Sequence, residues 1–196
     1  MKPVCILMAA GGSVRFGANK LLQELGGKPV IRWALEAAEA AFDRVILVTG
    51  YEAVAAQAET ARVVWNRHPE EGISRTIRLG LEAAGDCEGA VFMTADQPFL
   101  SAQTLRRLAC AFEENPDQIC AAAHHGKRGN PVVFPKAYFK ELCKLTGDVG
   151  GAKIIKAHPE SLRLLEVEER ELLDCDTPGA LERLARELQA DCTEKT

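Results

Sequence analysis

The sequence predicts a single α/β domain whose sheet is mostly parallel. Short apolar runs rich in Val, Ile and Leu alternate with helical patterns along the whole chain, which is typical of strands connected by crossover helices. The 196 residues, 47% of them hydrophobic, suffice for one compact core and leave little room for a second. The chain shows neither an internal repeat nor a low-complexity tract, so residues 1–196 are expected to form one domain.

The first half of the chain alternates strands and helices in a regular order. The apolar run at 4–9 ends at a glycine pair and predicts a buried strand, because it is too short for a membrane span and lacks the layout of a signal peptide. Ser101 is a good N-cap for the helix that follows the fourth run. In this half we expect strands at 4–9, 45–50, 62–66 and 90–95, and helices at 29–41, 51–58, 73–84 and 102–114.

Beyond about residue 115 the rhythm changes. Two β-like runs flank the turn-rich segment 125–130, which predicts a small β-hairpin or ribbon insertion. Thr177 precedes Pro178, a residue favoured at the first position of a helix. In this half we expect strands at 119–124, 131–134, 162–167 and 172–176, and helices at 136–145, 150–157 and 178–189.

Charge and cysteine usage exclude several classes of protein. The formal net charge is −4, and Lys and Arg are spread along the chain, so we expect no nucleic-acid partner. The seven cysteines are odd in number and far apart and include no C-x-x-C pair, which argues against a disulfide framework or a zinc knuckle. We therefore expect a cytoplasmic protein that binds neither nucleic acid nor membrane.

The loop after the first strand combines glycines with two basic residues. Gly11, Gly12 and Gly17 let a backbone approach an anion closely and offer it N–H groups, while Arg15 and Lys20 add positive charge. This is the place where α/β sheets bind nucleotide phosphates, so the loop is a candidate triphosphate site. Glycines alone would be equally consistent with a tight turn.

Two well-known phosphate loops do not match this one. A Walker loop requires Gly-Lys followed by Ser or Thr, whereas Gly17 is followed here by Ala18 and Asn19. A dinucleotide fingerprint requires G-x-G-x-x-G, whereas the glycines fall at 11, 12 and 17. The spacing thus disfavours a P-loop kinase or ATPase and a dinucleotide-binding protein.

Two acidic positions are candidate metal ligands. Asp96 follows the apolar strand 90–95, where open α/β sheets place active sites, and Asp176 follows a short run near the C-terminus. Phosphate transfer develops charge that a divalent metal neutralises, and magnesium often takes only one or two protein carboxylates. Each aspartate has a structural alternative, because Asp also starts turns before proline and favours helix N-termini.

The glycine loop also resembles a known family. Ala9-Ala10-Gly11-Gly12-Ser13 with Arg15-Phe16-Gly17 and Lys20 is similar to the A-A-G-x-S-x-R-[FM]-G-x-x-K signature of the MobA-like nucleotidyltransferases. The resemblance implies a three-layer α/β/α Rossmann-like nucleotidyltransferase fold in which the loop wraps NTP phosphates. It implies catalytic roles for Lys20, Arg15 and Asp96, and nucleotide contacts from Ala9, Ala10, Gly11, Gly12, Ser13, Arg15, Lys20 and Asp96.

Further segments match the same family in its order. Asp96-Gln97-Pro98 resembles its D-x-P motif and Asp174-Cys175-Asp176-Thr177-Pro178 its D-x-D-T-P segment, which implies a Mg²⁺ site at Asp96 and Asp176 and leaves Asp174 open. The stretch from Asn66 to Leu81 resembles one that lies near the bound nucleotide in one branch, which implies base or ribose contacts from Asn66 and Ser74. The alternative for that stretch is an ordinary amphipathic helix.

The acceptor side is similar to the molybdenum cofactor cytidylyltransferases. Lys127 to Val132 resembles R-G-x-P-V, and Thr146 to Lys153 resembles G-D-x-G-[AG]-[RK], which implies acceptor contacts from Arg128, Asn130 and Asp148. The resemblance implies CMP transfer from CTP to molybdopterin, with a molybdenum hydroxylase apo-enzyme as a further partner. It assigns 1–115 to the NTP and 116–190 to the acceptor.

Three alternatives remain open from the sequence. They are guanylyl transfer, transfer to a sugar or polyol phosphate, and a non-catalytic carrier of the molybdenum cofactor. The adjacent His124 and His125 lack a third ligand at usable spacing, and Cys175 lacks an activating neighbour, so we assign no chemistry to them.

Overall fold

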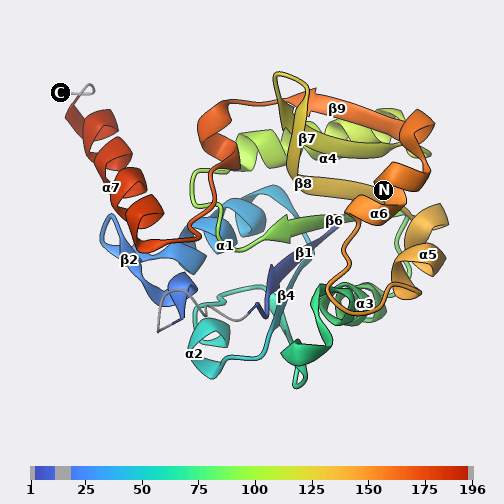
Figure 1. Cartoon of the computed structure of the whole chain (residues 1–196), viewed down its shortest axis with the longest axis horizontal. Coiled ribbons are helices and arrows are strands. Elements are labelled where there is room, and N and C mark those ends of the chain that lie inside the picture. Colours follow the sequence, from blue (N-terminus) through green and yellow to red (C-terminus); the bar gives the residue numbers. More distant parts are fainter. Residues whose placement is uncertain (1–2, 12–18, 194–196) are drawn as a thin grey trace.

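The computed structural model describes residues 3–11 and 19–193, with side chains described as far as residue 189. Its main sheet has seven strands in the order β5-β4-β1-β6-β8-β7-β9 (Figure 1). Among them β8 runs antiparallel to both of its neighbours, and every other pairing is parallel. The strands are β1 (Val4–Ala9), β4 (Val45–Thr49), β5 (Arg62–Trp65), β6 (Gly89–Thr94), β7 (Ile119–His124), β8 (Lys127–Pro135) and β9 (Leu162–Glu166).

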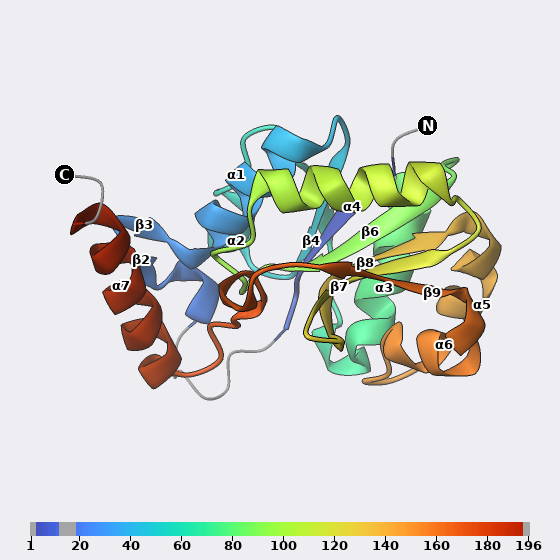
Figure 2. The ribbon, with the colours of Figure 1, turned by 90° about the horizontal axis from the view of Figure 1, so that it is seen from above.

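Helices cover both faces of this sheet and make three layers (Figure 2). On one face lie α1 (Val30–Ala41) and α4 (Ala102–Glu114), and on the other lie α3 (Ile73–Ala84), α5 (Phe139–Cys143) and α6 (Ala152–Ala157). The expected α/β/α fold with a mostly parallel sheet is therefore confirmed. The remaining elements are α2 (Glu52–Ala55), α7 (Pro178–Thr193), the two-stranded sheet of β2 (Glu24–Leu25) and β3 (Lys28–Pro29), and the 3-10 helices η1 (Lys20–Leu22), η2 (Pro69–Glu71), η3 (Lys136–Tyr138), η4 (Pro159–Ser161) and η5 (Glu169–Leu172).

The interior strand β1 divides the core between the two helical layers. Its side chains alternate, as those of any strand do: Cys5 and Leu7 pack on the side of α1 and α4, whereas Val4 and Ile6 pack on the side of α3. Gly80 allows α3 to lie close to β1, because a methyl group there would overlap the Ile6 side chain. This packing fixes the position of α3 relative to β1, and residues of both elements line the pocket described below.

The carboxyl ends of β1 and β6 lie side by side at one edge of the sheet. Met8 is paired with Thr94, and the chain leaves β1 toward the glycine loop and β6 toward Asp96. The chain moves from β1 to β4 and β5 on one side and returns to place β6 on the other. Such a switch in strand order opens a crevice beyond the strand ends, which is where α/β sheets bind ligands.

The hairpin in the second half extends the main sheet. The sequence predicted a turn as far as residue 130, but the turn is confined to His125 and Gly126, which have φ values of 48° and 76°. Two successive residues with positive φ are typical of the tight turns that join adjacent strands. Strand β8 consequently begins at Lys127 and brings the 127–130 segment to the same edge as the ends of β1 and β6.

Several sequence-based boundaries were wrong. The expected strand at 172–176 is not a strand, because η5 ends at Leu172 and the Cys175 amide donates to the Asp96 carbonyl at 2.8 Å instead of joining a ladder. The helix expected at 51–58 is the single turn α2, in which Val54 is the one buried residue. The helix expected at 136–145 is the 3-10 turn η3 followed by α5. Across the described residues, none of the helices is both long enough and apolar enough to cross a membrane.

Candidate active site

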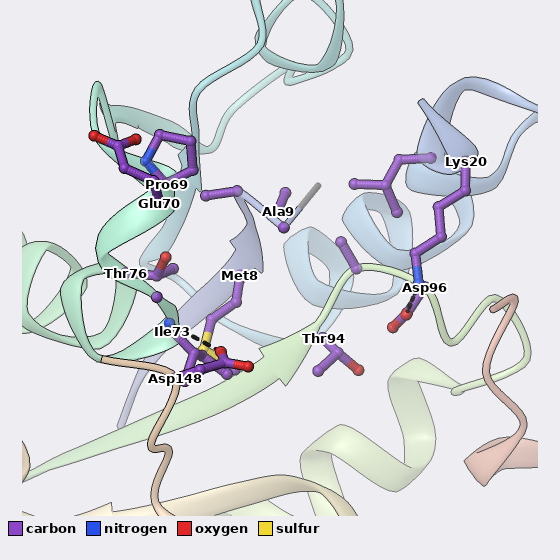
Figure 3. A pocket seen from close by; sticks show the side chains of 15 residues that line it. Met8, Ala9, Lys20, Pro69, Glu70, Ile73, Thr76, Thr94, Asp96 and Asp148 are labelled. Carbon is purple, nitrogen blue, oxygen red and sulfur yellow. Dashed lines mark hydrogen bonds and ion pairs between the residues drawn. The ribbon is translucent and has the colours of Figure 1, made fainter. Parts of the chain in front are cut away.

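A pocket of about 550 Å³ lies beyond the carboxyl ends of β1 and β6. Figure 3 shows Lys20 and Asp96 at one end of it, Pro69 and Glu70 at the opposite end, and Thr94 between them. The lining residues are Met8, Ala9, Ala10, Gly11, Lys20, Leu21, Pro69, Glu70, Gly72, Ile73, Thr76, Thr94, Ala95, Asp96 and Asp148.

Lys20 forms ion pairs with two carboxylates from distant parts of the chain. Its Nζ donates to Asp96 Oδ2 at 2.5 Å and to Asp176 Oδ1 at 2.7 Å. Burial alone would lower the pKa of the Lys20 ammonium, but the two carboxylates outweigh it and raise that pKa above its usual range. Lys20 is therefore charged at neutral pH. The three residues expected to surround a triphosphate do come together.

Short local structures hold Lys20 and Asp176 in these positions. Lys20 opens η1, and the Asn19 side chain accepts from the Leu21 amide at 3.1 Å, which caps that turn. Asp176 precedes Thr177, whose hydroxyl accepts from the Ala180 amide at 3.1 Å and caps α7 as the sequence predicted. Lys20 thus lies at the start of a capped helix, and Asp176 lies directly before one.

Asp174 is a third carboxylate close to Asp96, Asp176 and Lys20, although it does not line the pocket. Burial, followed by the charges of Asp96 and Asp176, raises its pKa to about 6, although a Gln97 hydrogen bond and the Lys20 charge oppose the rise. Between Asp174 and Asp176 the Cys175 side chain is fully buried, and burial raises the pKa of its thiol to about 11. A protonated buried thiol is not a nucleophile, in line with the sequence interpretation.

The residues fit a divalent cation at Asp96 and Asp176. Their oxygens converge on a single cationic atom, Lys20 Nζ, and Asp96 Oδ1 is buried with no hydrogen-bond partner among the described residues. Hard divalent cations take carboxylate oxygens and complete their shell with water and phosphate. No group of three or more His, Cys, Asp or Glu in the described part of the chain is placed to hold a metal, so a cation here would need such outside ligands.

The first part of the glycine loop borders the pocket. Ala9, Ala10 and Gly11 all line it, as expected for nucleotide-binding residues. The Thr49 hydroxyl donates to the Ala9 carbonyl at 3.0 Å and thereby holds the end of β1 against β4. The expected phosphate ligands Gly12, Ser13 and Arg15 lie outside the described residues.

The two residues expected to contact the base or ribose do not line the pocket. Asn66 and Ser74 are buried. The Asn66 amide group instead joins elements, since its Nδ2 donates to Thr76 Oγ1 at 3.2 Å and its Oδ1 accepts from Arg75 Nε at 3.1 Å. The residues at that end are Pro69, Glu70 and Thr76. The one sequence signal for this end was Gly72. A glycine there indicates a sharp turn between η2 and α3, which brings Pro69, Glu70 and Thr76 to the pocket.

A second pocket of about 200 Å³ adjoins the first. Arg128 and Asn130, two of the expected acceptor ligands, line it together with apolar side chains. The two pockets share Met8, Ile73 and Thr94 as lining residues. They are therefore neighbours along the edge of the sheet, one beside Asp96 and the other beside β8.

The third expected acceptor ligand, Asp148, lies at the boundary of the two pockets. It lines the first pocket, and its Oδ1 accepts from the Ile73 amide at 3.4 Å (Figure 3). The neighbouring Gly147 carbonyl accepts from the Ser74 amide at 3.3 Å. The 147–148 segment thus caps the start of α3 and, with Gly150 and Gly151 in the second pocket, separates the two spaces.

The histidines that lacked a third ligand serve as structural contacts. His124 Nδ1 lies 2.9 Å from the Val167 carbonyl, and the His125 amide donates to Glu166 Oε1 at 2.8 Å. Both contacts join the turn of the hairpin to the end of β9. Among the described residues, neither histidine lines either pocket.

The comparisons with known proteins agree with this geometry. A model of the MobA-like NTP transferase domain matches residues 5–162. The chain belongs to this family. The matched range includes the described glycine-loop residues, Lys20 and Asp96, and it ends before Asp176. Members of the family are NTP transferases, and this chain has the corresponding nucleotidyltransferase fold.

Two relatives of this MobA-like chain differ in how much of their length it matches. The purine catabolism protein PucB of Bacillus subtilis (strain 168) is 27% identical over 197 residues, which cover 92% of this chain and 95% of PucB. The 3-deoxy-manno-octulosonate cytidylyltransferase of Bdellovibrio bacteriovorus is 30% identical over 129 residues, 64% of this chain and 51% of that protein. The chain therefore matches about half of that second relative's length.

Solved structures resemble the whole fold. Rv0371c from Mycobacterium tuberculosis H37Rv superposes with a TM-score of 0.80 at 29% identity, covering 95% of this chain and 99% of that one. A second structure of Rv0371c, in complex with manganese, has a TM-score of 0.77 at 28% identity, with the same coverage. The likeness extends past the matched domain, which ends at residue 162, into the part of the chain that carries Asp176.

Proposed function

We propose that this chain transfers CMP from CTP to the phosphate of molybdopterin and releases pyrophosphate. The product would be a cytosine dinucleotide form of the molybdenum cofactor, for use by a molybdenum hydroxylase apo-enzyme. The observation that carries the proposal is the meeting of Lys20, Asp96 and Asp176 at the end of a pocket formed by the glycine-loop strand. The Lys20 ammonium, held between two carboxylates beside this pocket, is suited to stabilise charge that develops on a phosphate.

The reaction itself needs no covalent intermediate on the protein. An oxygen of the acceptor phosphate attacks the α-phosphorus of the NTP, the bond from that phosphorus to the bridging oxygen breaks, and pyrophosphate leaves with the electron pair. Ala9, Ala10 and Gly11 border the NTP, and Lys20 directs its charge toward the α-phosphate. Catalysis then depends on positioning and on electrostatic stabilisation.

Asp96 and Asp176 would hold a Mg²⁺ ion. When bound, a divalent cation neutralises charge on the phosphate oxygens during transfer. Support for a divalent cation comes from the paired carboxylates and from the manganese complex of the relative Rv0371c. Asp174 is the weaker candidate ligand, because the hydrogen bonds described for Lys20 Nζ go to Asp96 and Asp176.

We assign the acceptor to the second pocket. Arg128 brings a positive charge and Asn130 an amide to a space that is otherwise largely apolar, which suits one flat ring system with a polar edge and a phosphate. The NTP would bind to residues up to about 115, and the acceptor mainly to residues 116–190. Thr94, which lines both pockets, marks where the two substrates meet.

The choice of CTP rests on the motifs and on one relative. Ala9-Ala10-Gly11 and the Arg128-Gly129-Asn130-Pro131-Val132 segment resemble the cytidylyl branch, and the Bdellovibrio relative is itself named a cytidylyltransferase. The acceptor in that relative's name, 3-deoxy-manno-octulosonate, differs from the molybdopterin proposed for this chain. The acceptor is thus the part of the proposal that most needs a direct test.

One assay separates the candidate functions. The protein is incubated with Mg²⁺, each of the four NTPs in turn, and either molybdopterin-type cofactor or a panel of sugar and polyol phosphates, and pyrophosphate is measured. Release that requires CTP and the pterin supports the proposal. Release with GTP would indicate guanylyl transfer, and release with a sugar or polyol phosphate would indicate another acceptor. Tight pterin binding without release under any condition would make the chain a carrier.

A further inference from the structure

We propose that Lys20 and a divalent cation compete for the same two carboxylates, so that the cation binds tightly only after Lys20 has moved away from them. This inference rests on the proposed metal site at Asp96 and Asp176. It assigns Lys20 a second role. Without the triphosphate, the Lys20 charge keeps a divalent cation from binding to the two carboxylates, and when the triphosphate binds, Lys20 leaves the carboxylates to the cation.

The first step of the argument is steric. Lys20 Nζ lies 2.5 Å from Asp96 Oδ2 and 2.7 Å from Asp176 Oδ1, so the ammonium occupies the space between the two oxygens. A divalent cation bound by both oxygens at about 2.0 to 2.6 Å would have to occupy that same space. The ammonium and the cation are therefore mutually exclusive at this position.

The second step is electrostatic. The Lys20 and Asp96 side chains are only 18% and 16% exposed, so water screens the charges between them poorly. Asp176 is 54% exposed and gives the pair an open side toward solvent. A cation approaching from that side meets an ammonium that is already neutralising the carboxylates. The affinity of the cation for the two carboxylates should therefore be lower with Lys20 present than with Lys20 replaced by a neutral residue.

The third step concerns where Lys20 can go. It opens a three-residue 3-10 helix beside the pocket, and four rotatable bonds separate Nζ from the backbone. Gly11 and Ala10 line the same pocket as Lys20, and triphosphate oxygens bound there would offer the ammonium new partners. Transfer of Lys20 to the phosphates would release both carboxylates. The triphosphate and the cation would then raise each other's affinity, as linkage requires.

The test measures Mn²⁺ binding to the full-length protein without nucleotide, by the EPR signal of free Mn²⁺. The variants are Lys20→Met, which keeps side-chain length without charge, Lys20→Gln as a second neutral variant, and Lys20→Arg, which keeps the charge. We expect both neutral variants to bind Mn²⁺ about tenfold or more tightly than wild type, the size of effect that one nearby like charge has on an ionisation equilibrium. Lys20→Arg should remain as weak as wild type.

Asp96→Asn in the wild-type and Lys20→Met backgrounds separates two ways of failing. If Lys20→Met and Lys20→Gln bind Mn²⁺ no more tightly than wild type, while Asp96→Asn weakens binding, the metal site stands and the competition is refuted. If Asp96→Asn leaves Mn²⁺ affinity unchanged in both backgrounds, the metal site of the proposed function fails as well. Far-UV circular dichroism of each variant checks that the fold is retained.

Discussion

Gly72 lines the first pocket and packs against the 147–148 segment, so its replacement by alanine is a sharp test of the site geometry. Its φ and ψ of 84° and −179° lie in a region that is essentially restricted to glycine. A methyl group at this position would also overlap the Gly147 carbonyl group and lie 2.6 Å from the Asp148 backbone nitrogen. The change therefore acts both on the backbone at the start of α3 and on the segment that caps it.

The expected magnitude follows from these two terms. Holding a residue other than glycine in this region costs about 1–3 kcal/mol, and forcing extra atoms into a filled space costs about another 1–3 kcal/mol. Gly85→Ala is the matched control. Gly85 also has positive φ, 61°, but nothing lies within 4 Å of the position that its Cβ would take. We expect a loss of about 2–6 kcal/mol in the free energy of unfolding for Gly72→Ala, and of about 1–3 kcal/mol for Gly85→Ala.

Urea denaturation followed by circular dichroism measures both losses under the same conditions. Isothermal titration calorimetry with CTP and Mg²⁺ then measures the affinity of the pocket for CTP. Gly72 lines this pocket and Gly85 does not. Gly72→Ala should weaken CTP binding, whereas Gly85→Ala should leave it near the wild-type value. A free energy of unfolding that falls equally in both variants, with CTP binding unchanged, would show that the close contact between Gly72 and the 147–148 segment is not formed in solution.

Three further predictions concern single side chains. Asp96→Ala should abolish pyrophosphate release and leave the circular dichroism spectrum unchanged, because it removes a metal ligand and not a core contact; a near-normal rate would exclude Asp96 from the site. Lys20→Ala should lower kcat more than it raises KM for the NTP, because its charge acts on the transferring phosphate, and an effect on KM alone would contradict this. Arg128→Ala should raise KM for the acceptor about tenfold or more and leave KM for the NTP unchanged, since charge-assisted bonds contribute about 1.5–3 kcal/mol; the control is its exposed neighbour, Lys127→Ala.

The sequence predicted that Lys20 and Asp96 lie close together, because the ends of parallel strands share one edge of a sheet. Asp96 follows an apolar strand and Lys20 follows a glycine loop after another such strand, so the periodicity of the two strands was enough to bring the residues close. The parallel register, with Met8 opposite Thr94, places the ends of the two strands side by side. The resemblance to a known family supplied Asp176, for which local signals alone had left a capping role equally plausible.

The end of the pocket formed by Pro69, Glu70 and Thr76 could not be predicted in the same way. An asparagine amide suits a ligand or an internal turn equally well, and only the packed structure reveals that Asn66 bonds Thr76 and Arg75. The two-residue strands β2 and β3 are too short to produce a periodic signal. The segment at 172–176 has strand-like composition, yet the tertiary contact of Cys175 with Asp96 replaces sheet pairing. At Asn66 and at 172–176, a tertiary contact overrode a local preference.

The Cys175 contact also explains why the active site is a property of the whole fold. Lys20 and Asp176 are 156 positions apart in the sequence, and Asp176 reaches Lys20 through a segment that belongs to no sheet. The fully buried Cys175 side chain and the bond from its amide to the carbonyl of Asp96 help to hold that segment. Because that carbonyl belongs to Asp96, which also pairs with Lys20, the segment 172–176 docks against one of the two carboxylate residues that bind Lys20. A loss of packing at Cys175 should therefore displace Asp176 before it disturbs the sheet.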